Sequence, residues 1–202
     1  MKLYYSPGAC SLAAHIVLRE AGIEFQPVEV NLGTKKTVNG DDFLAINPKG
    51  YVPALEFEDG QVLTEDHVII QYLADQKPAL GLAPAFGTMA RYRLMEWLGF
   101  IATEVHKGFG PLWNSTTPET TRQNAVAQLS RRFEYLAGKL AGGPWLMGEA
   151  YTVADAYLFT VLRWSDVHHI DLSRWPRLIE YMGRVTQRSA VQEALRAEHL
   201  ID

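Results

Sequence analysis

Hydrophobic positions recur at two different periods along the chain, and the change of period divides it in two. Residues 2–5 are apolar and aromatic, and residues 28–32 alternate between apolar and polar, which indicates two short strands. Between them, the apolar positions of residues 12–17 fall on one face at helical spacing. From residue 87 onward only the helical period remains. The pattern therefore predicts a mixed α/β region followed by an all-helical region.

Two further strands are predicted around a turn. Residues 54–57 and 61–64 flank Asp59-Gly60, a strong hairpin signal, and Thr64-Glu65-Asp66 then opens a helix. Pro27 lacks an N–H group for a strand ladder, so it favours an edge position for the second strand. The order strand, helix, edge strand, hairpin, helix predicts a mixed four-stranded sheet with helices.

Prolines and a glycine interrupt the helical pattern in residues 77–84, which indicates a linker. We therefore expect a first domain over residues 1–80 and an all-helical domain over residues 87–202. The core stripe expected in the first long helix of that domain is Met95, Leu98, Ala102, Val105 and Phe109. Further on, Thr152 and Asp155 form a capping box before a helix that is apolar nearly all round. Asp155 is thus predicted to be structural.

Composition excludes several functions. The 202 residues are 48% hydrophobic, and the net charge of -4 includes no basic tract, which argues against nucleic acid or an anionic membrane as the main partner. No glycine-rich phosphate fingerprint appears, and no metal site is expected. A single cysteine and an N-terminus without signal-peptide features favour a cytoplasmic location.

The single cysteine, Cys10, lies where the first strand hands over to the first helix. Unpaired N–H groups and the macrodipole at a helix N-terminus stabilise a thiolate. Donors that qualify for a charged sulfur are Cys10 itself and the side chains of Ser11, Tyr5 and His106, and the sequence does not rank them. By itself the pattern also fits a small buried hydrophobe at Cys10, a buried aromatic at Tyr5 and a surface histidine at His106.

Several motifs in order carry a resemblance to a known family. They are Cys10-Ser11 after the first strand, Gly50-Tyr51-Val52-Pro53, Thr64-Glu65, the proline-rich linker, His106-Lys107 and the Thr152-Val153-Ala154-Asp155 box. Over essentially its whole length the chain resembles a bacterial glutathione S-transferase of the beta class. The resemblance implies a thioredoxin-like N-terminal domain, an all-α C-terminal domain, a homodimer, and glutathione as co-substrate. It also implies conjugation of the glutathione thiolate to small hydrophobic electrophiles.

The resemblance also assigns site residues by position. Val52 pairs its backbone with the cysteinyl part of glutathione across a cis peptide to Pro53, Lys35 reaches the glycine carboxylate, and Cys10 lies beside the sulfur. The implied glutathione-binding residues are Cys10, Lys35, Val52, Pro53, Glu65, Asp66, Gly99, Thr103, Glu104 and His106, with residues 99–104 coming from the partner subunit. The implied electrophile pocket is His106, Lys107, Phe109, Trp113 and Trp164.

Two positions depart from the family pattern. Asp66 stands where Gly or Ser is usual, and Gly99 where Asn is common. We expect the Asp66 carboxylate to cap its own helix and to repel the γ-glutamyl carboxylate, which weakens glutathione binding. Two alternative functions stay open: a glutathione-dependent redox or peroxidase protein acting through Cys10, and a non-catalytic ligand-binding protein of the same fold.

Overall fold

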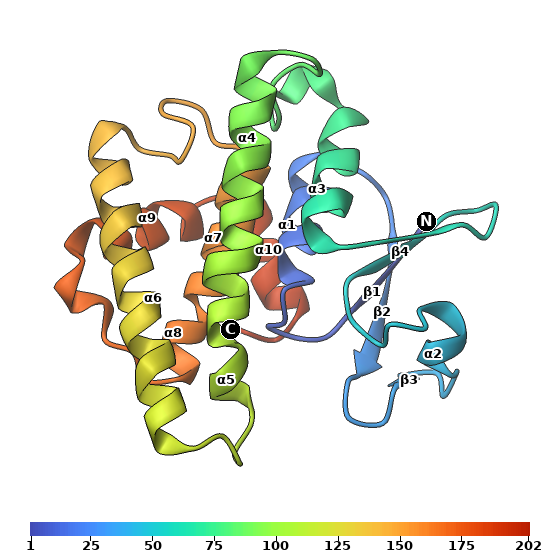
Figure 1. The fold of residues 1–202 in the computed structure, drawn as a ribbon. Coiled ribbons are helices and arrows are strands. Elements are labelled where there is room, and N and C mark those ends of the chain that lie inside the picture. The colour runs from blue at the N-terminus through green and yellow to red at the C-terminus, as the bar shows by residue number, and fades with distance from the viewer. The chain divides into compact units, whose positions relative to one another are not determined.

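The computed structural model describes residues 1–202 and divides the chain into two compact units (Figure 1). The first unit contains Met1–Leu82 and Gln187–Asp202, and the second contains Ala83–Thr186. We expected the helical domain to run to residue 202, whereas the last helix packs with the N-terminal unit. Its apolar face lies against the first helix, which explains why the chain returns to the unit where it began.

The first unit is built on a mixed sheet with strand order β3-β2-β1-β4-β5. The strands are β1 (Lys2–Tyr5), β2 (Gln26–Asn31), β3 (Lys36–Thr37), β4 (Ala54–Glu56) and β5 (Val62–Thr64). Strands β1 and β2 are parallel, and the other pairs are antiparallel. The hairpin is confirmed, but the prediction of four strands was wrong by one, because a polar segment folds back and pairs the two-residue β3 with the end of β2. The stretch of β2 that contains Pro27 has no partner on that side.

Four helices complete this unit: α1 (Leu12–Glu20), α2 (Phe43–Ile46), α3 (Asp66–Asp75) and α10 (Ser189–Ala197), with a 3₁₀ turn η1 (Pro78–Leu80). Helix α1 packs against both α3 and α10, and its residues 12–18 are all buried. On the sheet, Tyr4, Val30 and Phe43 belong to a buried cluster that also includes Val52. The sheet and α1 therefore form the rigid frame that carries the Cys10 turn.

The second unit is helical. Its elements are α4 (Met89–Phe100), the π-helical η2 (Ile101–His106), the 3₁₀ turn η3 (Lys107–Phe109), α5 (Gly110–Trp113), α6 (Glu119–Lys139), the 3₁₀ turn η4 (Leu140–Gly142), α7 (Val153–Leu162), α8 (Trp164–Val167), the 3₁₀ turn η5 (Leu172–Arg174) and α9 (Pro176–Thr186). All ten residues of α7 are buried, as its uniform apolar character predicts. No helix is long and apolar enough to cross a membrane.

The core stripe predicted for the first long helix needs a correction. Met95 is exposed and Ala102 is only half-buried, whereas Leu94 and Ile101 are fully buried in their place. Leu98, Val105 and Phe109 are buried as expected. The buried residues Leu94, Leu98, Ile101, Val105 and Phe109 also recur at three- and four-residue steps, so the spacing fits two stripes and the packing selects the one with Leu94 and Ile101.

Candidate functional site

Cys10 lies in the turn between β1 and α1. The Ala9 N–H donates to the Ser6 carbonyl at 3.0 Å, and the Cys10 carbonyl accepts the first helical bond from the Ala13 N–H at 2.9 Å. The thiol is half-buried and donates to the Val52 carbonyl at 3.1 Å. The Val52–Pro53 peptide bond is cis, as the family resemblance implied. The structure thus brings Cys10 and Val52 together from positions far apart in the sequence.

Two of the residues suggested as thiolate donors have other surroundings. The Ser11 hydroxyl is fully buried; it accepts from the Ser6 N–H at 3.2 Å and lies 3.3 Å from the Ser6 carbonyl. Ser11 therefore closes the turn that presents Cys10. Tyr5 is buried, and its ring lies edge-on to that of His15. Burial raises the pKa of its phenol, and the negative charges of Glu29 and Glu198 raise it further. The phenol is thus held in its neutral form.

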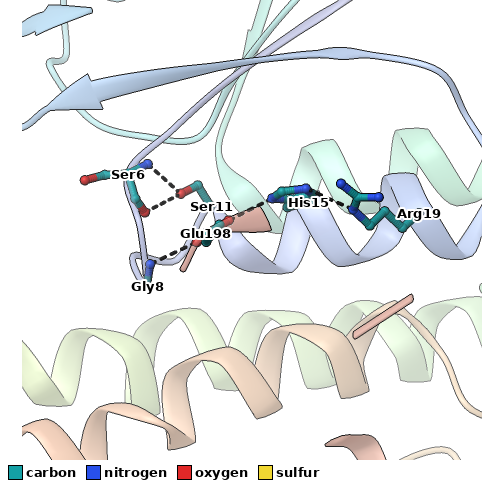
Figure 2. Close-up of polar contacts among 6 residues, drawn as sticks. All are labelled: Ser6, Gly8, Ser11, His15, Arg19 and Glu198. Atoms are coloured by element: carbon teal, nitrogen blue, oxygen red, sulfur yellow. Dashed lines mark hydrogen bonds and ion pairs between the residues drawn. The ribbon is translucent and has the colours of Figure 1, made fainter. Parts of the chain in front are cut away.

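A chain of polar contacts ties the Cys10 turn to the C-terminal segment (Figure 2). The buried Glu198 carboxylate accepts from the Gly8 N–H at 2.9 Å and contacts Nδ1 of His15 at 2.9 Å. Arg19 Nε donates to Nε2 of His15 at 3.1 Å, so that nitrogen carries no proton and Nδ1–H donates to Glu198. Sequence reasoning missed Glu198 and His15. Nothing local marks a contact between residues 190 positions apart.

Lys35 lies beside the loop that leads to Val52. Its Nζ donates to the Gly50 carbonyl at 2.9 Å, and its own backbone has a positive φ of 56°. Asn47 donates to the Tyr51 carbonyl at 2.7 Å and so braces the same loop. Val52 itself is buried. The predicted Lys35 is therefore close to the predicted Val52 segment, although its ammonium group already has a backbone partner.

Glu65 precedes α3 and adopts a strained backbone conformation with φ 71° and ψ 109°. Its half-exposed carboxylate pairs with Lys49 Nζ at 2.7 Å, and the same nitrogen contacts Thr64 Oγ1 at 2.8 Å. Lys49 was not among the predicted site residues. Its place beside Gly50 in the same loop was the only local signal available.

Asp66 does not do what its position suggested. It is the first residue of α3, it makes no side-chain cap, and both carboxylate oxygens are buried without a hydrogen-bond partner. Burial raises the pKa of Asp66 well above its ordinary value. The Ala14 backbone lowers this pKa in part, and the charge of Glu65 raises it further. The expectation that Asp66 caps its own helix was wrong, because its buried carboxylate accepts no hydrogen bond from the backbone N–H groups of the first turn.

The second unit carries the other predicted residues. His106, at the end of η2, contacts the buried Tyr157 hydroxyl through Nδ1 at 2.6 Å, and its ring lies edge-on to Trp164 with centroids 4.9 Å apart. Tyr157 was missed because it belongs to the apolar run of α7. The imidazole is oriented from two sides by α7 and Trp164.

Aromatic rings form a continuous group around Trp164, which we call the Trp164 cluster. Its ring contacts join His106, Phe109, Trp113, Trp164 and His168. Phe109 and Trp164 are buried, and Trp113 is exposed. His168 was not predicted; its Nε2 is buried without a partner, and burial followed by Arg122 lowers the pKa of its ring. The cluster therefore forms a largely aromatic wall, within which the buried His168 Nε2 atom has no hydrogen-bond partner.

Gly99, Thr103 and Lys107 recur every four residues and are all exposed. The Thr103 hydroxyl donates to the Gly99 carbonyl at 3.0 Å. Glu104 forms an ion pair with Arg132 at 2.6 Å. The surface that these residues share is accessible within this chain, but the Glu104 carboxylate already has a cationic partner. No group of three or more His, Cys, Asp or Glu side chains is arranged to hold a metal ion.

Comparisons with known proteins agree along the whole chain. The family model for the glutathione S-transferase N-terminal domain matches residues 8–76, and that for the glutathione S-transferase C-terminal domain matches residues 100–189. The chain is 48% identical to the glutathione S-transferase GstA of Escherichia coli O157:H7 over 99% of this chain and 100% of that protein.

Solved structures give the same result. A glutathione transferase from Methylococcus capsulatus is 63% identical with a TM-score of 0.98, covering 99% of each chain. A sphingomonad glutathione S-transferase complexed with glutathione is 46% identical with a TM-score of 0.96, covering both chains completely. A beta class glutathione S-transferase of Sphingomonas chungbukensis is 45% identical, with the same TM-score and coverage.

Proposed function

This chain belongs to the glutathione S-transferase family, and from that premise we propose that its first unit holds glutathione through Cys10, Val52 and Glu65. The likeness to the beta class and the expected fold are confirmed. The protein is an enzyme that conjugates glutathione, its co-substrate, to electrophiles. What remains for proposal is which residues act and on which substrates.

The contact between the Cys10 thiol and the Val52 carbonyl carries the assignment. An extended peptide ligand pairs its main chain with a backbone segment outside the strand ladder, and Val52 lies just before β4. A cysteinyl residue paired there brings its own sulfur to the Cys10 turn. The nearby Lys35 ammonium suits the glycine carboxylate, and the Glu65 carboxylate suits the γ-glutamyl ammonium.

In the reaction, the glutathione thiolate attacks an electrophilic carbon. A carbon–sulfur bond forms, the leaving group departs with its electron pair, and the thiol proton passes to solvent. A free thiol with a pKa near ~8.5 is only a few per cent ionised at neutral pH, and each unit of depression needs about 1.4 kcal/mol. One hydrogen bond to a charged sulfur supplies roughly 1.5–3 kcal/mol, so the Cys10 thiol, turned from Val52 toward the ligand, is sufficient.

The Trp164 cluster supports small hydrophobic electrophiles as substrates. The exposed Trp113 and the half-buried His106 present surface to a ligand, while Phe109 and Trp164 lie beneath them as a floor. Lys107 follows His106 in the chain and is exposed, and it adds a positive charge for leaving anions.

A second activity is favoured by one observation: Cys10 is the single cysteine of the chain, and its thiol is partly accessible. We propose that its thiolate attacks a glutathionyl disulfide, which expels one thiolate and leaves a mixed disulfide. A second glutathione thiolate then attacks this bond and releases Cys10 together with oxidised glutathione. A single cysteine, which cannot form a disulfide within the chain, also fits a reducing cytoplasm, where we propose that the protein acts.

We also propose a homodimer. Phe86, Met89, Tyr92 and Met95 are exposed large apolar side chains in and just before α4, and the last three follow one another at three-residue steps. Gly99 and Thr103 continue along the same segment, which supports their predicted role in the partner's glutathione site. Light scattering should report twice the chain mass, and the double substitution of Tyr92 and Met95 by Glu should give a monomer.

The decisive test combines binding and turnover. Millimolar glutathione should raise the melting temperature of the wild-type protein, because it binds only the folded state. Cys10→Ala should abolish the mixed disulfide seen by mass spectrometry and lower conjugation of a nitro-activated aryl chloride about 10- to 100-fold, the cost of one hydrogen bond to the thiolate. An unmoved melting temperature would count against the assigned site, and unchanged conjugation in Cys10→Ala would remove Cys10 from catalysis.

A further inference from the structure

Asp66 is the one buried carboxyl group in the proposed glutathione site that has no partner. It is 5% exposed, and neither oxygen accepts or donates a hydrogen bond. A carboxylate without partners is costly to bury in ionised form, whereas a neutral carboxylic acid is tolerated far better. The fold therefore favours the neutral, protonated form of Asp66 and supplies no hydrogen bond that would stabilise the anion.

No cation on the neighbouring elements offsets a charge on Asp66. On α1, His15 and Arg19 are engaged with Glu198 and Glu193, and Glu20 with Arg188. Strand β5 and the turn η1 contain no titratable side chain. On its own element, Glu65 raises the pKa of Asp66, and His67 follows it directly. The ammonium group of Lys49 is paired with Glu65.

The start of α3 has two backbone donors open. The N–H groups of Val68 and Ile69 both donate to the Glu65 carbonyl, at 2.9 Å each. The N–H groups of Asp66 and His67 have no acceptor in the chain. Open amides at the positive end of a ten-residue helix attract a carboxylate, and the buried acid of Asp66 lies at the same place.

We propose that Asp66 gates the carboxylate end of the glutathione site: as a neutral acid it leaves the two open amides to the γ-glutamyl carboxylate, and as an anion it repels that carboxylate. The inference rests on the proposed function, and it adds that glutathione binding is coupled to the protonation of Asp66. Glutathione binds only when Asp66 is protonated. At a pH where Asp66 is ionised in the free protein, glutathione binding therefore takes up one proton. Affinity then falls by about tenfold per pH unit above the pKa of this carboxyl.

The test is calorimetric titration with S-methylglutathione, which has no thiol to titrate, between pH 5 and pH 9. Wild-type protein is compared with Asp66→Asn, which keeps the size of the side chain and is never charged. Repeating each titration in buffers of different ionisation enthalpy counts the protons taken up. His67 is present in both proteins, so the difference between them isolates Asp66.

We expect equal affinities at pH 5 and, once the pH passes the pKa of Asp66, a weaker wild-type complex with a proton uptake that exceeds that of Asp66→Asn. Parallel affinity curves with equal proton uptake would overturn the inference and leave the proposed function standing. Absence of S-methylglutathione binding by the wild-type protein at every pH would overturn both. Asp66→Ser, which offers a hydroxyl in the same position, serves as a second neutral variant, and the wild-type proton count requires no variant at all.

Discussion

Two helices of equal length bury an aspartate in their first turn, and the fold treats the two carboxyl groups in opposite ways. In α7, Asp155 accepts from the Leu146 N–H at 2.9 Å, the Thr152 N–H at 2.8 Å and the Thr152 and Tyr181 hydroxyls at 3.2 Å each. In α3, Asp66 accepts from no group. Burial raises both pKa values, that of Asp155 to about 6 against the opposing effect of its donors.

The difference separates a structural carboxylate from one that the fold leaves unused. Asp155 joins the loop before α7, the helix start and α9, so three segments depend on it. Asp66 joins nothing, and it lies beside the residues assigned to glutathione. A buried polar group whose hydrogen bonds are all formed contributes to stability. A buried polar group without hydrogen bonds lowers stability, so its presence suggests a role other than stability.

Asp155→Ala should produce the largest effect. It removes the capping box and leaves the Leu146 and Thr152 N–H groups without an acceptor, so the free energy of unfolding should fall by roughly 3–5 kcal/mol. Urea unfolding followed by circular dichroism measures this. Asp66→Ala is the matched control and should cost far less than Asp155→Ala. Equal losses of unfolding free energy in the two variants would show that Asp155 and Asp66 do not differ in their structural role.

Asp66→Asn should stabilise the protein at pH 7 by about 1–3 kcal/mol, because it removes the burial penalty of an unpartnered acid. The raised pKa means that the folded state holds the proton more tightly than the unfolded chain. Stability is therefore full below the unfolded pKa of about 3.9 and is lost as the pH rises toward the folded value. The gain should thus grow with pH and be small at about pH 4. A gain that is constant with pH would show that charge is not its cause.

Tyr181→Phe removes one of the hydrogen-bond donors to the Asp155 carboxylate and so measures the contribution of that bond to stability. The Tyr181 hydroxyl is buried and contacts both the Asp155 carbonyl at 3.1 Å and its carboxylate. We expect a loss of about 1–2 kcal/mol in the free energy of unfolding, with the helix cap intact. In a double-mutant cycle the loss should largely vanish in the Asp155→Ala background, and additive losses would contradict a direct interaction.

Lys49→Met should have the smallest effect on stability. Its ion pair with Glu65 is half-exposed on both sides, so the free energy of unfolding should change by less than about 1 kcal/mol. Binding of S-methylglutathione should tighten a few-fold, since Glu65 loses a competitor for the ligand ammonium. Lys36→Met carries the same charge change on β3 and is the control. Equal tightening in both variants would mean that net charge alone is responsible.

The sequence alone determined the features that depend on neighbouring residues. The Asp59-Gly60 hairpin, the capping box at Thr152 and Asp155, and the helix that begins after Cys10 all follow from propensities and spacings over a few positions. These local signals, in their order, were also sufficient to identify the family. They also gave no warning of the π-helical stretch, and they did not separate two stripes of the same helical spacing, so Met95 was assigned to the core in place of Leu94.

Only the tertiary structure decided how polar groups are satisfied. Gly8 and Glu198 meet because α10 packs on α1, and Lys49 meets Glu65 because a loop and a helix start lie side by side. Asp66 and Asp155 have the same side chain at helix starts, yet one has four contacts and the other none. A carboxylate is satisfied by whichever donors the folded chain brings within about 3 Å, and that is a property of packing, which residue spacing along the chain does not contain.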